Sequence, residues 1–154
     1  MSEKPVSEKP TSRIVRKHSP DEKEVLSKLL VDEKTYLTNL DAIVDSVKAV
    51  FVIEHPSGRV IFKNFGEMND NQRLLALLLG KYFAGRLGLI EADTLGITEI
   101  ATELGRPKTS LSGPIKELVD DQLVVKTPER KYKIAYHQMD EITGIIVSGG
   151  KIQK

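Results

Sequence analysis

The chain lacks cysteine altogether and contains no long hydrophobic run. The absence of cysteine excludes a disulfide scaffold and thiolate chemistry, and it is compatible with the reducing cytoplasm in which we expect the protein to lie. The most apolar run, Leu74 to Leu79, is bounded by Arg73 and Lys81, far short of the roughly 20 residues that span a bilayer. The opening stretch, Met1 to Ser19, is charged and contains proline, so we expect neither a signal peptide nor a membrane partner.

Catalytic and metal-binding constellations are also missing from the sequence. His18, His55 and His137 have no carboxylate or cysteine at metal-ligand spacing. The stretch from Gly85 to Gly88 lacks the lysine and the hydroxyl of a phosphate-binding loop, and it is more typical of a helix terminus. The sequence therefore predicts a protein that is not an enzyme and that uses no cofactor or metal.

The sequence does contain enough apolar residues for a core, and its charge is unevenly distributed. Hydrophobic residues make up 40% of the 154 residues and the net charge is +1, which indicates a globular protein. The stretch from Leu104 to His137 has a net charge of +3, whereas the stretch from Ser19 to Lys48 has a net charge of −3. Such segregation is typical of a phosphate-facing surface backed by an acidic body, although chance clustering on a solvated face gives the same pattern.

Residues 1–18 are predicted to form a disordered basic tail. Ser2-Glu3-Lys4-Pro5 recurs as Ser7-Glu8-Lys9-Pro10, and Arg13, Arg16 and Lys17 follow. This stretch has too little apolar surface to offset the entropy of ordering. It would serve either as an arm that adds nonspecific phosphate contacts or as a solubilising tail.

Residues 19–64 are predicted to form an amphipathic helical segment and a β-hairpin. Ser19-Pro20-Asp21 has the order of an N-cap, a first-turn proline and an acidic first turn. An apolar heptad pattern follows, which suits either pairing of two copies in a homodimer or one or two helices packed on their own domain, with a break between Asp32 and Asn39. The heptad residues are Leu26, Leu30, Leu37, Leu40, Val44 and Val47.

The predicted hairpin consists of two β-branched and aromatic runs, Ala49–Glu54 and Arg59–Asn64. They are joined by His55-Pro56-Ser57-Gly58, in which proline presets the turn and glycine takes a positive φ. The sequence indicates no obvious ligand pocket in this hairpin.

Residues 65–137 are predicted to be the main domain, and residues 138–154 a C-terminal extension. A helix over Asn71–Gly85, capped by Asn69 or Asp70, is apolar on most faces and should therefore be buried. Leu87–Leu95 is predicted to be a connection. The extension would form a last helical turn or an added strand before order ends at Gly149-Gly150.

A short helix, a tight turn, a second helix and a basic hairpin follow one another from Ile97 to Tyr136. Thr98 is predicted to cap the first helix, and Gly105 can adopt the left-handed conformation that ends it. The second helix opens at Arg106-Pro107-Lys108, and the hairpin Leu123–Tyr136 has Thr127 to Arg130 at its tip. The second helix has one apolar face, formed by Leu111, Ile115, Leu118 and Val119.

This stretch resembles the winged helix-turn-helix of bacterial and archaeal transcription regulators. The resemblance covers roughly a quarter of the chain and is a pattern that very many proteins share; its sequence is GITEIATELGRPKTSLSGPIKELVDDQLVVKTPERKYKIAY. It implies an α+β fold, with helix 107–121 in the DNA major groove and the basic hairpin 123–136 as the wing. One departure is Gly113-Pro114, because an interior proline costs a helix about 3 kcal/mol. We therefore expect a kink between Ser110 and Pro114.

The resemblance and the charge pattern together predict a transcription regulator that binds double-stranded DNA as a homodimer. Contacts to the DNA backbone are expected from Thr98, Ser110, Ser112, Lys116, Arg130 and Lys131. Contacts to the bases are expected from Lys108, Thr109 and Arg106. Two alternatives are a winged-helix protein-interaction module, which Gly113-Pro114 and Asp120-Asp121 favour, and a plasmid or viral DNA-maintenance factor. The candidate DNA-binding residues are Thr98, Arg106, Lys108, Thr109, Ser110, Ser112, Lys116, Lys126, Arg130, Lys131 and Lys133.

Overall fold

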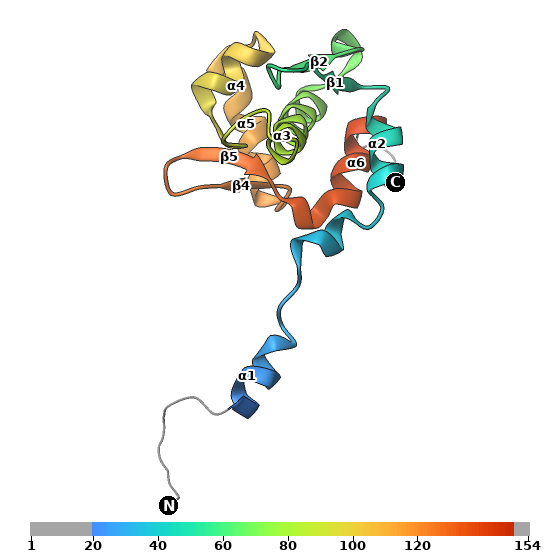
Figure 1. Cartoon of the computed structure of the whole chain (residues 1–154). Coiled ribbons are helices and arrows are strands. Elements are labelled where there is room, and N and C mark those ends of the chain that lie inside the picture. Colours follow the sequence, from blue (N-terminus) through green and yellow to red (C-terminus); the bar gives the residue numbers. More distant parts are fainter. Residues whose placement is uncertain (1–19, 150–154) are drawn as a thin grey trace, which may run out of the picture. The chain divides into compact units, whose positions relative to one another are not determined.

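A long helix, α3 (Asp70–Arg86), is surrounded by the other elements of its unit (Figure 1). In the computed structural model, which describes residues 20–149, the chain divides into one unit up to Thr35 and another from Tyr36 onward. Leu74 to Leu79 are at most 1% exposed, so the predicted burial of this helix is confirmed. The described residues form six α-helices and two small sheets, which confirms the predicted α+β class. None of these helices is long and apolar enough to cross a membrane.

Side chains fix the N-terminus of α3. Asn69, one of the two predicted caps, accepts a hydrogen bond from the backbone amide of Gln72, and Gln72 Oε1 accepts one from the amide of Asn69, each at 2.8 Å. This reciprocal pair satisfies amide groups that a first helical turn leaves without partners. Gln72 Nε2 also donates to the carbonyl of Ile146 at 2.9 Å, which ties the start of α3 to the C-terminal helix.

The predicted hairpin is present and packs against α3. Strands β1 (Phe51–Ile53) and β2 (Val60–Phe62) are antiparallel, and Gly58 in the turn has a φ of 78° as expected. Helices α2 (Leu40–Val47) and α6 (Met139–Ser148) pack against each other beside α3. The stretch after His137 therefore forms a helix of ten residues. The sequence predicted either a last helical turn or an added strand here, and the helix found is longer than the predicted turn.

The remaining elements of this unit are β3 (Leu95–Gly96), α4 (Ile97–Leu104), α5 (Lys108–Asp120), β4 (Val124–Lys126) and β5 (Lys131–Ile134). The three strands form an antiparallel sheet in the order β3-β5-β4. The end of the predicted connection is thus a strand. The sequence does not reveal β3, because two residues have no detectable periodicity.

The predicted helical segment is divided into short pieces. Helix α1 (Pro20–Ser27) begins at its proline as predicted, and a 3₁₀ helix (Glu33–Leu37) follows within the predicted break. The heptad positions therefore do not form one continuous seam, and Val47, at 3% exposure, belongs to the core instead. The predicted tail, 1–18, and the cap at Ser19 lie outside the described residues.

One local prediction differs from the structure. Helix α4 begins at Ile97 with Gly96 in the N-cap position, so the prediction that Thr98 is the cap is wrong. The amide of Gly96 is instead satisfied by Glu99 Oε1 at 2.8 Å. Helix α5 is continuous past Pro114, and buried apolar residues before and after the proline hold both halves against the core. The kink expected between Ser110 and Pro114 stays a prediction, because a kinked helix is also continuous.

Replacing Gly80 with alanine is expected to lower the free energy of unfolding by about 1–3 kcal/mol. Gly80 lies in α3 where the β1–β2 hairpin packs, and an added Cβ would stand 2.5 Å from Val60 Cγ2 and 3.3 Å from Phe51 Cε1. The crowding therefore outweighs the better helix propensity of alanine. Urea denaturation followed by circular dichroism at 222 nm measures the change.

Gly85→Ala is the matched control, because an added Cβ in the same helix would meet only Asp93 Cβ, at 3.8 Å. That variant should gain stability, by up to about 1 kcal/mol. Equal stability of the two variants would contradict the close packing of the hairpin on α3.

Candidate nucleic-acid interface

Helix α5 places its apolar and polar side chains on opposite faces. Leu111, Ile115 and Leu118 are at most 4% exposed, and the helix packs against α3, α4 and β4. A Cβ added at Gly113 would meet nothing within 4 Å, so the backbone at this point is open to the outside. We call the exposed surface around Gly113 the α5 ridge; it consists of Lys108, Thr109, Ser112, Gly113 and Lys116.

The charges at the two ends of α5 oppose the helix dipole. Lys108 is the first helical residue, at the partially positive end, whereas Asp120 and Asp121 are the last residue and the C-cap. Each such placement typically costs about 0.3–1 kcal/mol. The arrangement concentrates positive potential at one end of the ridge, where an anion would be stabilised.

The side chains of six predicted contact residues have hydrogen-bond or ion-pair partners among the described residues: Thr98, Arg106, Lys108, Ser110, Ser112 and Lys116. Lys108 Nζ donates to Thr98 Oγ1 at 3.4 Å, which places both side chains at the same end of the ridge. Lys116 Nζ pairs with Asp120 Oδ2 at 3.0 Å, with both side chains more than 60% exposed. The hydroxyl of Ser110 donates to the carbonyl of Pro107 at 2.9 Å. An exposed pair such as Lys116–Asp120 is weak enough to exchange for a phosphate contact.

Arg106 lies away from the α5 ridge. Its Nη2 donates to Asp70 Oδ2 at 3.1 Å, at the first residue of α3. Gly105, with a φ of 64°, makes the predicted left-handed turn that directs Arg106 there. The structure therefore does not place Arg106 with Lys108 and Thr109, and its observed contact fixes the α4–α5 turn to α3.

A groove connects α5 to the β4–β5 hairpin. Its volume is about 430 Å³, and its rim carries Lys116 from α5 and Lys126 from β4. Lys126 Nζ lies 6.0 Å from the centre of the Tyr132 ring on the neighbouring strand. The groove brings Ser112 and Lys116 of α5 together with Lys126 of β4. The other residues that line it are Ile97, Ile115, Val119 and Tyr132.

The predicted wing residues divide between the two faces of the hairpin. Because side chains alternate along a strand, Tyr132 and its cross-strand partner Lys126 share the face toward α5. Lys131 and Lys133 lie on the opposite face by the same alternation. Arg130 is exposed at the tip, where its φ is 64° and its amide donates to the carbonyl of Thr127 at 2.9 Å. The hairpin extends beyond the helices (Figure 1).

Two residues that matter for this surface were missed by the sequence analysis. Tyr132 supports Lys126 within the groove, and Asp70 holds Arg106. The alternation of charged and apolar residues in β5 could have indicated Tyr132. No sequence signal links Asp70 to Arg106, because the two residues are 36 positions apart.

Within residues 20–149, no group of three or more histidine, cysteine, aspartate or glutamate side chains could hold a metal ion. Comparisons of the chain with known protein families, with curated proteins and with solved structures found no match.

Proposed function

We propose that α3, α4, α5 and the three-stranded sheet form a winged helix-turn-helix domain, and that the protein binds duplex DNA as a transcription regulator. The order helix, short strand, two helices and hairpin supports this proposal. In this arrangement α5 enters the major groove, whose width of about 12 Å admits a helix. The β4–β5 hairpin is then the wing beside it.

The proposal depends above all on the groove between α5 and the hairpin. Lys116 of α5 and Lys126 of β4 both line it, so that the α5 ridge and the hairpin each contribute a lysine to the same groove. Phosphate contacts from these lysines and from Arg130 would position the protein without reading sequence. Lys108 and Thr109, at the exposed start of α5, would reach the base edges.

A protein-interaction module is the second candidate, and the acidic end of α5 favours it. Asp120 and Asp121 are exposed, and Asp120 neutralises Lys116. Selection from a random duplex pool, followed by gel shift at several salt concentrations, separates the two candidates. DNA binding predicts retention that weakens steeply with salt, whereas a protein-docking module would give neither retention nor salt dependence.

The α1 unit supports the further proposal that the regulator acts as a homodimer. Leu29 and Leu30 are 78% and 79% exposed, and Val25, Leu26 and Val31 are each more than half exposed. So many exposed aliphatic side chains within seven residues are typical of a surface that another chain covers. A second copy would bury them and would supply the second DNA-binding surface that a two-fold operator requires.

Arg130→Gln is expected to weaken binding to all duplexes alike. Arg130 is exposed at the hairpin tip, so its loss removes one phosphate contact and lowers the slope of log affinity against log salt by about 1. Fluorescence anisotropy with a labelled random duplex measures the slope. Lys63→Gln, which removes an exposed charge next to the β1–β2 hairpin, is the control and should leave the slope unchanged. Equal slopes for both variants would contradict a phosphate contact by the tip of the β4–β5 hairpin.

Gly113→Gln should leave the fold intact and lower DNA affinity about tenfold or more, equivalent to about 1.4 kcal/mol. The new side chain points into open space within α5, so it would stand between the helix backbone and the DNA. The same anisotropy titration measures the loss. Gly144→Gln in α6 is the matched control, because a Cβ there also meets nothing within 4 Å; a similar affinity loss in both variants would argue against α5 as the DNA-contacting helix.

Replacing Leu29 and Leu30 together with asparagine should convert a dimer into a monomer. Both residues belong to the unit up to Thr35 and neither is part of the hydrophobic core of the larger unit, so the fold of the larger unit should not change. Sedimentation velocity across a range of protein concentrations gives the mass of each form. A wild-type protein that stays monomeric throughout, or a double variant of unchanged mass, would refute the homodimer.

A further inference from the structure

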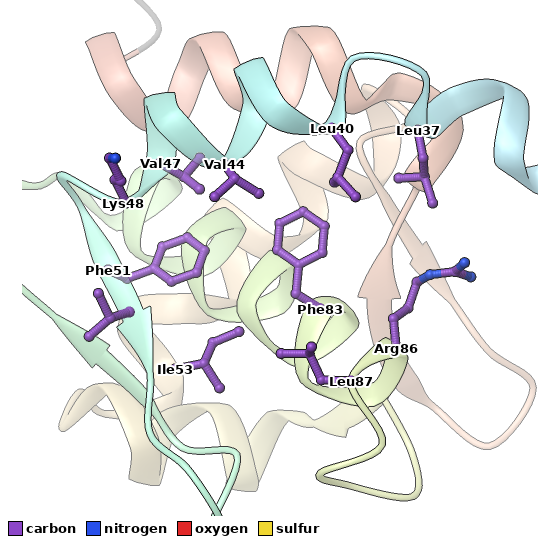
Figure 2. Close-up of a pocket in the computed structure, with 11 residues that line it drawn as sticks. Leu37, Leu40, Val44, Val47, Lys48, Phe51, Ile53, Phe83, Arg86 and Leu87 are labelled. Atoms are coloured by element: carbon purple, nitrogen blue, oxygen red, sulfur yellow. The ribbon is translucent and has the colours of Figure 1, made fainter.

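A second hollow in the larger unit lies between α2, β1 and the end of α3 (Figure 2). The volume of this cavity is about 460 Å³, and nine of the eleven residues that line it are hydrophobic. In Figure 2, Leu40 and Val44 face Phe83 across the opening. The sequence predicted no pocket beside this hairpin, because the cavity forms only when elements more than thirty residues apart meet.

Exposed apolar side chains are concentrated on two surfaces of the protein. Twelve large hydrophobic residues are exposed in the described part of the chain, of which five belong to the α1 unit and four line the cavity. The four at the cavity are Leu40, Val44, Val52 and Leu87. Concentrations of exposed apolar surface mark places where another surface binds.

The exposed residues of the α1 unit form a helical stripe. The amide of Leu30 donates to the carbonyl of Ser27 at 3.0 Å, so a helical turn continues past the last residue of α1. Leu26 and Leu30 are four residues apart and therefore share one side of the helix, as do Val25 and Leu29. An apolar stripe with this spacing is the shape that an apolar groove in a protein accepts.

The connection between α1 and the larger unit favours exchange between two copies. Residues 28–35 contain one residue type common in tight turns, Asp32, and no glycine, proline, asparagine or serine, so little in this stretch favours a tight reversal of the chain. The 3₁₀ helix that follows ends at Leu37, which itself lines the cavity. Two copies with their cavities side by side can therefore exchange their α1 helices reciprocally.

The charges of the two surfaces do not oppose this contact. Helix α1 contains three acidic residues and one basic residue. Among the described residues that line the cavity, none is acidic. An acidic helix therefore meets no like charge in the cavity wall.

We propose that the cavity of each copy receives α1 of a second copy, so that two chains exchange their α1 helices. The inference rests on the proposed homodimer and names the surface that α1 binds within it. Leu26 and Leu30 would enter the opening and would remove Val44 and Leu87 from water together with themselves. This one contact covers both exposed surfaces of both copies, whereas pairing of α1 with α1 would leave the cavity open.

Crosslinking tests the exchange in the full-length protein, because the chain has no cysteine of its own. Leu26→Cys with a mass-increasing tag is equilibrated with untagged Val44→Cys, and a short bismaleimide joins neighbouring thiols. The expected product is a covalent dimer of one tagged and one untagged chain. Leu26→Cys mixed with Val125→Cys is the matched control and should give no such product, because Val125 has a similar exposure (38%, against 42% for Val44) but does not line the cavity.

A second variant tests the cavity without a crosslink. Val44→Asp places a carboxylate where the acidic α1 would bind, so it should raise the dissociation constant of the dimer about tenfold or more. Sedimentation velocity measures the change. Val125→Asp, on β4, should leave the dissociation constant as it is in the wild type.

Three outcomes would overturn the proposal, and they distinguish it from the homodimer itself. A dimer that Val44→Asp leaves intact, with Leu26→Cys chains linked only to one another, would show that α1 pairs with α1 in a homodimer. A wild-type protein that is monomeric at every concentration would remove both the homodimer and the exchange. A double variant, Leu26→Cys with Val44→Cys, that links only within one chain would show that the cavity receives α1 of its own copy.

Discussion

The burial of α3 is the constraint on which the rest of the larger unit depends. A helix with six consecutive residues at most 1% exposed must be covered on nearly every side, because leaving such a helix in water forfeits about 25 cal/mol per Å² of apolar surface. The hairpin, α6, α5 and the three-stranded sheet provide that cover. Their positions relative to one another are therefore set by where each contacts α3.

Polar contacts also tie the α4–α5 pair to α3. Asp70 Oδ2 accepts a hydrogen bond from Arg106 in the turn, and Lys81, at 8% exposure, pairs with Glu103 of α4 at 3.1 Å. Lys81 is nearly buried, so loss of Glu103 would leave its charge poorly compensated, and this pair favours one orientation of α4 on α3. The consequence for the proposed function is that the α5 ridge faces outward in one defined direction.

The two proposed sites use different sides of the same central helix. The surface proposed to face DNA consists of α5 and the β4–β5 hairpin, whereas the cavity lies between α2, β1 and the C-terminal end of α3 (Figures 1 and 2). At each site the local sequence departs from what stability alone favours. Helix α5 carries Lys108 at its positive end and aspartates at its negative end, and the cavity leaves Val44 and Leu87 in contact with water. Departures of this kind are expected where function opposes stability.

The sequence by itself determined the elements whose signals are local. A cap at Asn69 or Asp70, the turn glycines Gly58 and Gly105, the buried helix and the basic hairpin all follow from side-chain chemistry within a few residues. Only the tertiary structure decided how distant segments meet. The strand β3, the Asp70–Arg106 contact, the groove that Lys116 and Lys126 both line and the apolar cavity all arise from packing around α3. A linear pattern cannot encode them, because the free energy that selects them comes from burial of surfaces far apart in the chain.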